Sequence, residues 1–132
     1  MPTADDNLSF PKSSRLKSSL LIKDIVRQRE AVFSFPVKCF YSVEASEGQT
    51  PPKVAFLVSK KRFRHAVDRN RVKRLLREAY RLHLRELELP ENTRLNLCWM
   101  FVGNGLPAFS QVESAAQHLF KELRSTLNTQ KR

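Results

Sequence analysis

The side chains best suited to chemistry in this sequence are the cationic ones between Lys60 and Arg85. Eleven Lys and Arg residues fall in this segment, against two carboxylates, Asp68 and Glu78. Guanidinium and ammonium groups bind phosphate oxygens through charge-assisted hydrogen bonds. Cations at this density repel one another, and a bound polyanion relieves the repulsion. The segment therefore favours a nucleic-acid surface.

Most of this segment is predicted to be one helix, from about residue 69 to 87. One face carries apolar residues at helical spacing, namely Val72, Leu75, Leu76, Ala79 and Leu82. The opposite face carries Asn70, Lys73, Arg74, Arg77 and Arg81. Asp68 precedes the pattern, where its carboxylate can cap free N–H groups and oppose the helix dipole.

The alternative is an ordinary solvated helix face, which is what most charged faces are. Such faces usually mix both signs, because opposite charges one turn apart stabilise a helix. Here the charge is almost entirely positive, and the 132-residue chain has a formal net charge of +11 at pH 7. An anionic membrane is the second class of partner, but the predicted helix lacks the Trp and Phe face of interfacial helices.

Residues that could form a catalytic centre or a metal site are scattered. His65, His83 and His118 form no HxH or HExxH pattern, and the three glycines form no phosphate loop. Cys39 and Cys98 lie in apolar runs without a CxxC motif, so both are expected to be reduced core residues. We therefore predict no catalytic residues and no metal site in the protein.

The N-terminal part is predicted to contain an arm, a helix and a strand. Residues 1–14 are expected to form a flexible polar and basic arm. A short helix, capped by Ser18 or Ser19, is expected to end near residue 29. Residues 31–43 are rich in β-branched and aromatic residues and predict one strand, with Pro36 marking its start or an edge.

Two further strands are predicted around the basic helix. Residues 45–52 are expected to form a hairpin loop between antiparallel strands, the second at 53–59. Residues 95–102 are almost continuously apolar, which predicts a strand buried on both faces. No apolar run reaches about 18 residues and no signal peptide is evident, so a soluble cytoplasmic protein is expected.

A last helix completes the predicted domain. Ser110 and Glu113 fit a capping box, and the apolar stripe contains Ala115, Ala116, Leu119, Phe120, Leu123 and Leu127. Residues 129–132 are expected to fray. The order α-β-β-α-β-α predicts a single α+β domain over residues 15–128, a sandwich of helices on a mixed, mostly antiparallel sheet of four or fewer strands.

Aromatic residues in the first strand give a second binding hypothesis. Phe33, Phe35, Phe40 and Tyr41 follow one another in a short stretch. Those on a face not covered by a helix could stack on unpaired bases. Core packing is the alternative for each of them, and the alternation of strand side chains requires that some be exposed.

Two sequence segments resemble a known family. SKK (59–61) and AVDRNRVKRLLREAY (66–80) resemble the signature of the bacterial ribonuclease P protein subunit. The RNR-x-KR-x-x-R pattern within them is highly specific at this length. The resemblance extends from about residue 15 to the last helix, with the same order of elements, and is strongest over 54–82.

The resemblance implies both a fold and a function. The fold is an α/β sandwich, similar to a domain of a ribosomal protein, in which the basic helix joins two parallel strands by a left-handed crossover. The function is to assist a catalytic RNA, with Mg²⁺ held mainly by that RNA, in removing the 5′ leader from precursor tRNA. One protein is expected to bind one RNA subunit and the single-stranded leader.

The resemblance also implies site residues. The RNA-binding candidates that match the family are Lys60, Lys61, Arg69, Asn70, Arg71, Lys73, Arg74 and Arg77. The cationic segment itself adds Arg62 and Arg81 to these candidates. The leader-binding candidates that match the family are Lys12, Arg15 and Phe40 or Tyr41. The aromatic strand itself adds Phe33 and Phe35 to these candidates. Two features depart from the family: a loop at 62–65 is one residue longer and lacks its usual Gly, and the aromatics usual on the first helix are replaced by Ile22 and Val26. Phe33 or Phe35 is expected to compensate.

Three other functions are alternatives to this one. A general or ribosomal RNA-binding protein without a processing role would share the basic helix. A helix-in-groove DNA binder is a poor match, because no paired helix-turn-helix pattern accompanies the helix. A free-standing protein nuclease would need an acid/base or metal cluster, which the sequence lacks.

Overall fold

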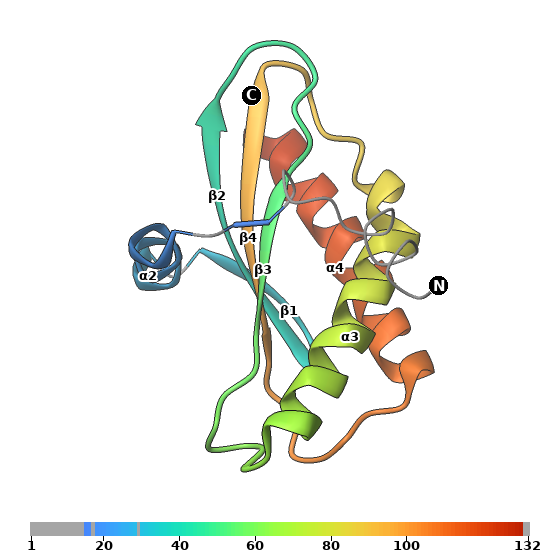
Figure 1. The fold of residues 1–132 in the computed structure, drawn as a ribbon. Coiled ribbons are helices and arrows are strands. Elements are labelled where there is room, and N and C mark those ends of the chain that lie inside the picture. The colour runs from blue at the N-terminus through green and yellow to red at the C-terminus, as the bar shows by residue number, and fades with distance from the viewer. Residues whose placement is uncertain (1–14, 17, 29, 131–132) are drawn as a thin grey trace, which may run out of the picture.

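The computed structural model describes residues 15–16, 18–28 and 30–130. It is an α+β fold with one mixed sheet of four strands (Figure 1). The α+β class and a mixed sheet of four or fewer strands are as the sequence predicts. The elements in chain order are α2 (Ser19–Gln28), β1 (Ala31–Ser34), β2 (Val37–Ala45), β3 (Lys53–Leu57), α3 (Ala66–His83), the 3-10 helix η2 (Leu84–Leu87), β4 (Thr93–Phe101) and α4 (Phe109–Gln130). Residues 1–14 and 131–132 lie outside the described residues, as does the arm predicted there.

The sheet has the strand order β1-β2-β4-β3. β1 with β2 and β2 with β4 are antiparallel, whereas β3 and β4 are parallel and are joined through α3. The prediction that residues 45–52 form a hairpin between neighbouring strands is therefore wrong, because β4 lies between β2 and β3. The apolar composition of β4 on both faces suits the interior position that it occupies.

The single strand predicted over 31–43 is a β-hairpin. β1 and β2 meet at a turn of Phe35 and Pro36, with Ser34 opposite Val37. Pro36 has no backbone N–H to donate to a ladder, so it suits the turn better than the interior of a strand. This division gives the fourth strand, which the sequence pattern did not separate.

The helix boundaries differ from prediction at two N-termini. α3 begins at Ala66 and not near residue 69, so Asp68 lies within the first turn, where it can still oppose the helix dipole but is not the cap. α4 begins at Phe109, and Glu113 bonds His83 of α3, so the predicted capping box is wrong. The expected cap of the first helix is confirmed: Ser18 Oγ accepts a hydrogen bond from Leu21 N at 3.2 Å.

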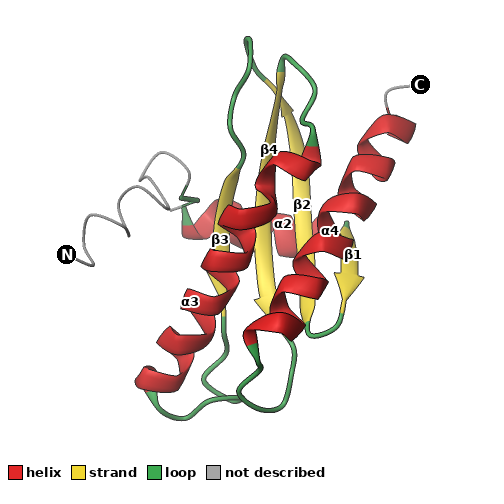
Figure 2. Cartoon of the chain, turned by 90° about the vertical axis from the view of Figure 1, so that its right-hand side faces the viewer, coloured by secondary structure: helices red, strands yellow, loops and turns green. Residues whose placement is uncertain are grey.

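Helices cover both faces of the sheet (Figure 2). α3 and α4 pack on one face, where Phe56, Tyr80, Trp99 and Phe120 form an aromatic cluster. α2 packs on the other face, in a smaller core that includes Ile25, Phe40 and Cys98. The predicted stripe of α4 is buried throughout. In this sandwich, the cationic face of α3 is exposed to solvent.

The two cysteines are free and buried, as the sequence predicts. Their side chains belong to different cores, Cys39 on the α3/α4 side of the sheet and Cys98 on the α2 side. Burial raises the pKa of the Cys98 thiol to about 11, and burial, followed by the proximity of Cys98, raises that of Cys39. Both are therefore protonated, unreactive core thiols at neutral pH.

Candidate nucleic-acid interface

Helix α3 separates its apolar and cationic residues onto two faces. Val72, Leu76, Ala79 and Tyr80 are buried against the sheet and α4. The candidate residues Asn70, Arg71, Arg74 and Arg81 are exposed, and Lys73 and Arg77 are half-buried. The helix therefore presents a row of cations over several turns, with alkyl stems that can pack on the protein while the charged ends face solvent.

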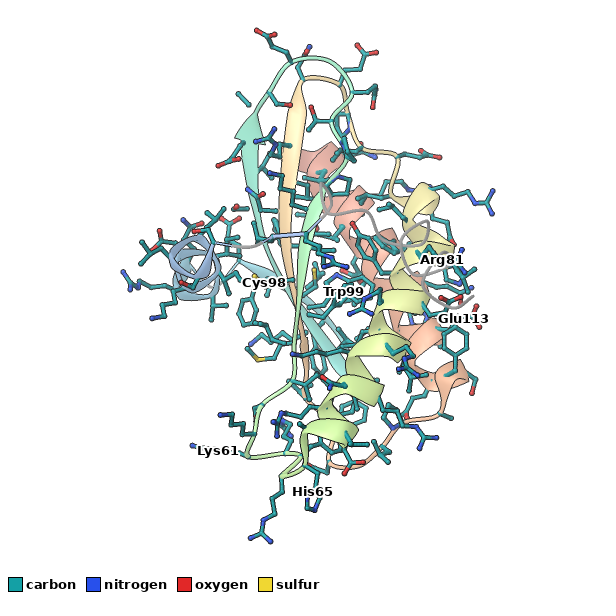
Figure 3. All side chains as sticks on the ribbon, in the orientation of Figure 1. Lys61, His65, Arg81, Cys98, Trp99 and Glu113 are labelled. Carbon is teal, nitrogen blue, oxygen red and sulfur yellow. The ribbon has the colours of Figure 1, made fainter. Side chains whose placement is uncertain are left out.

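The loop that leads into α3 adds cations at its N-terminal end. Lys60, Lys61, Arg62 and Arg64 are all exposed. Figure 3 shows Lys61 and His65 pointing away from the body of the protein at this end. The first-turn N–H groups of α3 lie in the same region, and a helix N-terminus attracts anions. The positive charge is thus densest at residues 60–74.

The candidate arginines Arg69 and Arg62 donate hydrogen bonds to backbone carbonyls of the protein itself. Arg69 Nη1 donates to the carbonyl of Phe63 at 2.7 Å and to that of Arg64 at 3.2 Å. Arg62 Nη1 donates to the carbonyl of Gly103 and to Asn104 Oδ1, both at 3.1 Å. Sequence spacing could not distinguish these arginines from Arg71 and Arg74, because a guanidinium can face a phosphate or a carbonyl equally well.

Positive charge declines toward the C-terminal end of α3. Arg81 forms an ion pair with Glu78, and both side chains are about two-fifths exposed. Such a pair contributes little to stability. It does place a carboxylate beside the cation, which weakens the attraction for an anion. Arg81 is therefore less suited to hold a phosphate than the exposed Arg71 and Arg74.

His83 lies between two carboxylates at the α3–α4 contact. Its Nε2 is 2.9 Å from Glu113 Oε2, and its Nδ1 bonds Glu86. Burial lowers the pKa of His83, but the hydrogen bonds and charges of Glu113 and Glu86 outweigh burial, and the pKa is raised above its usual 6.5. In its protonated form, His83 joins α3 to α4 by donating a hydrogen bond to Glu113.

We expect this histidine to make stability depend on pH. Its contribution is fully present below about pH 6.5, the pKa of the unfolded chain, and is lost as pH rises through the higher folded pKa. Thermal melts from about pH 6 to about pH 8.5 should show a falling melting temperature, and His83→Gln should flatten that fall. Identical pH dependence in the two proteins would contradict the assignment.

The candidate leader-binding aromatics occupy different environments. Phe33 and Phe35 are 57% and 56% exposed, whereas Phe40 is 6% exposed beneath α2 and Tyr41 is 5% exposed in the core on the α3/α4 side. The alternation of β2 accounts for the opposite directions of Phe40 and Tyr41. Arg15 is exposed and forms a bridge to β3 at Val54, and Lys12 lies outside the described residues.

One cation near these aromatics was missed by the sequence pattern. Lys38 Nζ lies 5.0 Å from the centroid of the Phe40 ring, and Lys38 is the cross-strand partner of Phe33. The three residues share the sheet face that α2 partly covers. The period-two alternation of β2 and the pairing with β1 could have placed Lys38 there, had the hairpin been recognised.

Within the described part of the chain, no three His, Cys, Asp or Glu side chains lie close enough to hold a metal ion. Among the described helices, none is long and apolar enough to span a bilayer. The described surface features that suit a nucleic-acid interface are the cations of α3 and its preceding loop, and the exposed aromatics of the β1–β2 hairpin.

Comparison with known proteins gives consistent results. The family described as Ribonuclease P matches residues 10–124. The ribonuclease P protein component of Porphyromonas gingivalis is 34% identical over 118 residues, which cover 87% of this chain and 86% of that protein.

Solved structures share the fold. The RNase P protein of Staphylococcus aureus superposes with a TM-score of 0.59 at 18% identity, covering 84% of this chain and 95% of that one. The RNase P protein of Thermotoga maritima gives a TM-score of 0.58 at 18% identity, covering 82% and 96%.

Proposed function

Because this chain belongs to the bacterial ribonuclease P protein family, we propose that it assists a catalytic RNA in removing the 5′ leader from precursor tRNA. The observation that carries the proposal is the almost entirely positive surface of α3 and the loop before it. In a ribonucleoprotein, such a surface would hold the phosphate backbone of the RNA subunit. The protein would act in the cytoplasm, one copy per RNA.

The proposal assigns different parts of the surface to different RNA segments. Lys60, Lys61, Arg71, Lys73 and Arg74 would contact phosphates of the RNA subunit. The hairpin aromatics Phe33 and Phe35, with Lys38 nearby, would contact the unpaired leader, since aromatic rings stack on bases of any sequence. Tyr41 is a poor candidate for this role because its ring is enclosed in the core.

Catalysis is proposed to reside in the RNA. Phosphodiester cleavage needs a positioned nucleophile and stabilisation of the developing charge, which Mg²⁺ ions held by the RNA would supply. The described protein residues would bind and orient RNA, and lower the repulsion between RNA segments brought together in the complex.

We expect the purified protein alone not to cleave precursor tRNA at the mature 5′ junction. The same protein added to its cognate RNA subunit should increase cleavage, most clearly at low salt and low Mg²⁺, where repulsion between RNA segments is screened least. The measurement is a cleavage assay with a labelled leader. Correct cleavage by RNA-free protein would refute the division of labour, and no effect on the RNA would favour a general RNA-binding role.

A further inference from the structure

The loop 59–65, called here the basic loop, is closed on itself before α3 begins. Backbone N–H groups of Arg62 and Phe63 donate to the carbonyl of Ser59 at 3.2 and 3.3 Å, and Arg62 N also reaches Ser59 Oγ at 3.3 Å. Phe63 is only 7% exposed and packs on Phe101, with ring centroids 5.7 Å apart. The loop is thus anchored to the core by one aromatic side chain.

Two arginines connect the basic loop to α3 and to the turn after β4. Arg69 reaches back from the first turns of α3 and donates to the carbonyls of Phe63 and Arg64. Arg62 reaches the turn after β4 and donates to Gly103 and Asn104. The loop, α3 and the β4–α4 turn are therefore joined by four side-chain hydrogen bonds from charged donors, which are stronger than neutral ones.

The basic loop needs no glycine, because none of its residues has a positive φ. Positive φ in the described residues occurs at Gly48, Glu88 and Asn92, none of which lies in the loop. The turn that receives Arg62 is itself closely packed, because a Cβ at Gly103 would lie 2.6 Å from the ring of Phe101. The partner of Arg62 is therefore held in place by the core.

We propose that Arg69 and Arg62 are positioning residues, which hold the basic loop so that Lys60, Lys61 and Arg64 join the start of α3 in one phosphate-binding surface. Arg69 then acts mainly through the loop and not as a phosphate contact of its own. The inference rests on the proposed RNA-binding function. Arg71, two residues from Arg69 and exposed, would by contrast contact RNA directly.

The first test needs only the protein. Limited trypsin digestion reports opening of the loop, because Lys60, Lys61, Arg62 and Arg64 are four cleavage sites within it. In Arg69→Met, cleavage at these sites should rise about fivefold or more, as expected for loss of about one net hydrogen bond. Arg71→Met removes the same charge from the same helix and should leave cleavage unchanged.

A second variant guards against misfolding as the cause. Arg62→Met cuts the other connection, leaves α3 untouched, and should also raise cleavage at Lys60, Lys61 and Arg64. Circular dichroism and thermal melts identify any variant that has lost its fold. Unchanged cleavage in both folded variants, Arg69→Met and Arg62→Met, would overturn the proposal.

The second test measures RNA binding and separates this inference from the proposed function. In the otherwise wild-type protein, Arg69→Met should weaken binding to the cognate RNA subunit. In a protein that already carries Lys60→Gln and Lys61→Gln, the same change should weaken binding much less, because Arg69 acts through the basic loop that holds these lysines. The effect of Arg71→Met should be nearly the same in both backgrounds. Equal effects of Arg69→Met in both backgrounds would make it an independent contact and overturn its positioning role.

The two hypotheses fail in different ways. If cleavage of the loop rises in Arg69→Met while neither Arg69→Met nor Arg71→Met changes RNA binding, the connection is real but the proposed RNA-binding function is wrong. If RNA binding weakens in both variants while the loop stays closed in Arg69→Met, the function stands and Arg69 is a direct contact.

Discussion

Replacing Arg71 and Arg74 together by Gln is expected to weaken binding to the cognate RNA subunit about a hundredfold or more, since each charged hydrogen bond contributes about 1.5 kcal/mol or more. Both side chains are exposed on α3, so the core residues Val72 and Leu76 beside them stay packed. The melting temperature should therefore change by no more than a few degrees.

The salt dependence of binding identifies phosphate contacts. Each lost contact should flatten the log–log salt slope by about 0.7 to 0.9, depending on whether the RNA is single- or double-stranded at the site, with the DNA values as a guide. The measurement is a titration of labelled RNA subunit at several salt concentrations. A second readout is the cleavage assay at limiting protein, in which the loss should follow the loss of affinity.

A matched control removes two charges elsewhere. Arg85→Gln with Lys121→Gln lowers the net charge equally, from exposed positions on η2 and α4. Equal loss of affinity in the two double variants would mean that only the overall charge matters. Unchanged affinity and slope in a folded Arg71 and Arg74 variant would mean that the row on α3 is a solvated face.

Replacing Phe33 and Phe35 together by Ala is expected to weaken binding of precursor tRNA to the holoenzyme by about 1–3 kcal/mol for each base that stacks. Mature tRNA lacks the leader, so its binding should change little. Both rings are more than half exposed, and their removal should cost little folding stability. The measurement compares affinities for precursor and mature tRNA.

A control variant separates stacking from a general loss of apolar surface. Leu82→Ala removes a 37% exposed apolar side chain from α3, outside the hairpin, and should leave precursor affinity unchanged. Phe40→Ala is less informative, because Phe40 is packed beneath α2 and its loss would disturb that core. Equal weakening of precursor and mature tRNA by the Phe33 and Phe35 variant would exclude leader stacking.

Local pattern predicted the elements better than their pairing. The apolar stripe of α4 and the doubly buried strand β4 could be predicted directly from residue spacing. A 3.6-residue repeat of apolar residues and a continuous apolar run are properties of the segment itself and do not depend on which elements pack against it. Local pattern could not predict that residues 31–45 divide into two strands at Pro36, or that β4 lies between β2 and β3. Both features depend on contacts between segments that are distant in the chain.

The sequence by itself determined that the protein has a core, that α3 has one apolar and one cationic face, and that the cations outnumber the carboxylates on it. These properties follow from residue type and helical period alone. It also indicated the family, through SKK at 59–61 and the run from Ala66 to Tyr80.

Only the tertiary structure decided which candidate residues face solvent and which bond the protein. Phe40 and Tyr41 are neighbours in the chain, yet they lie in different cores because a strand alternates its faces and each face is covered by different helices. Arg69 and Arg71 are equivalent in the sequence motif, yet Arg69 reaches the carbonyls of the basic loop and Arg71 faces solvent. The reason is geometric: residues two apart on a helix point about 200° apart, and the loop lies on one side only.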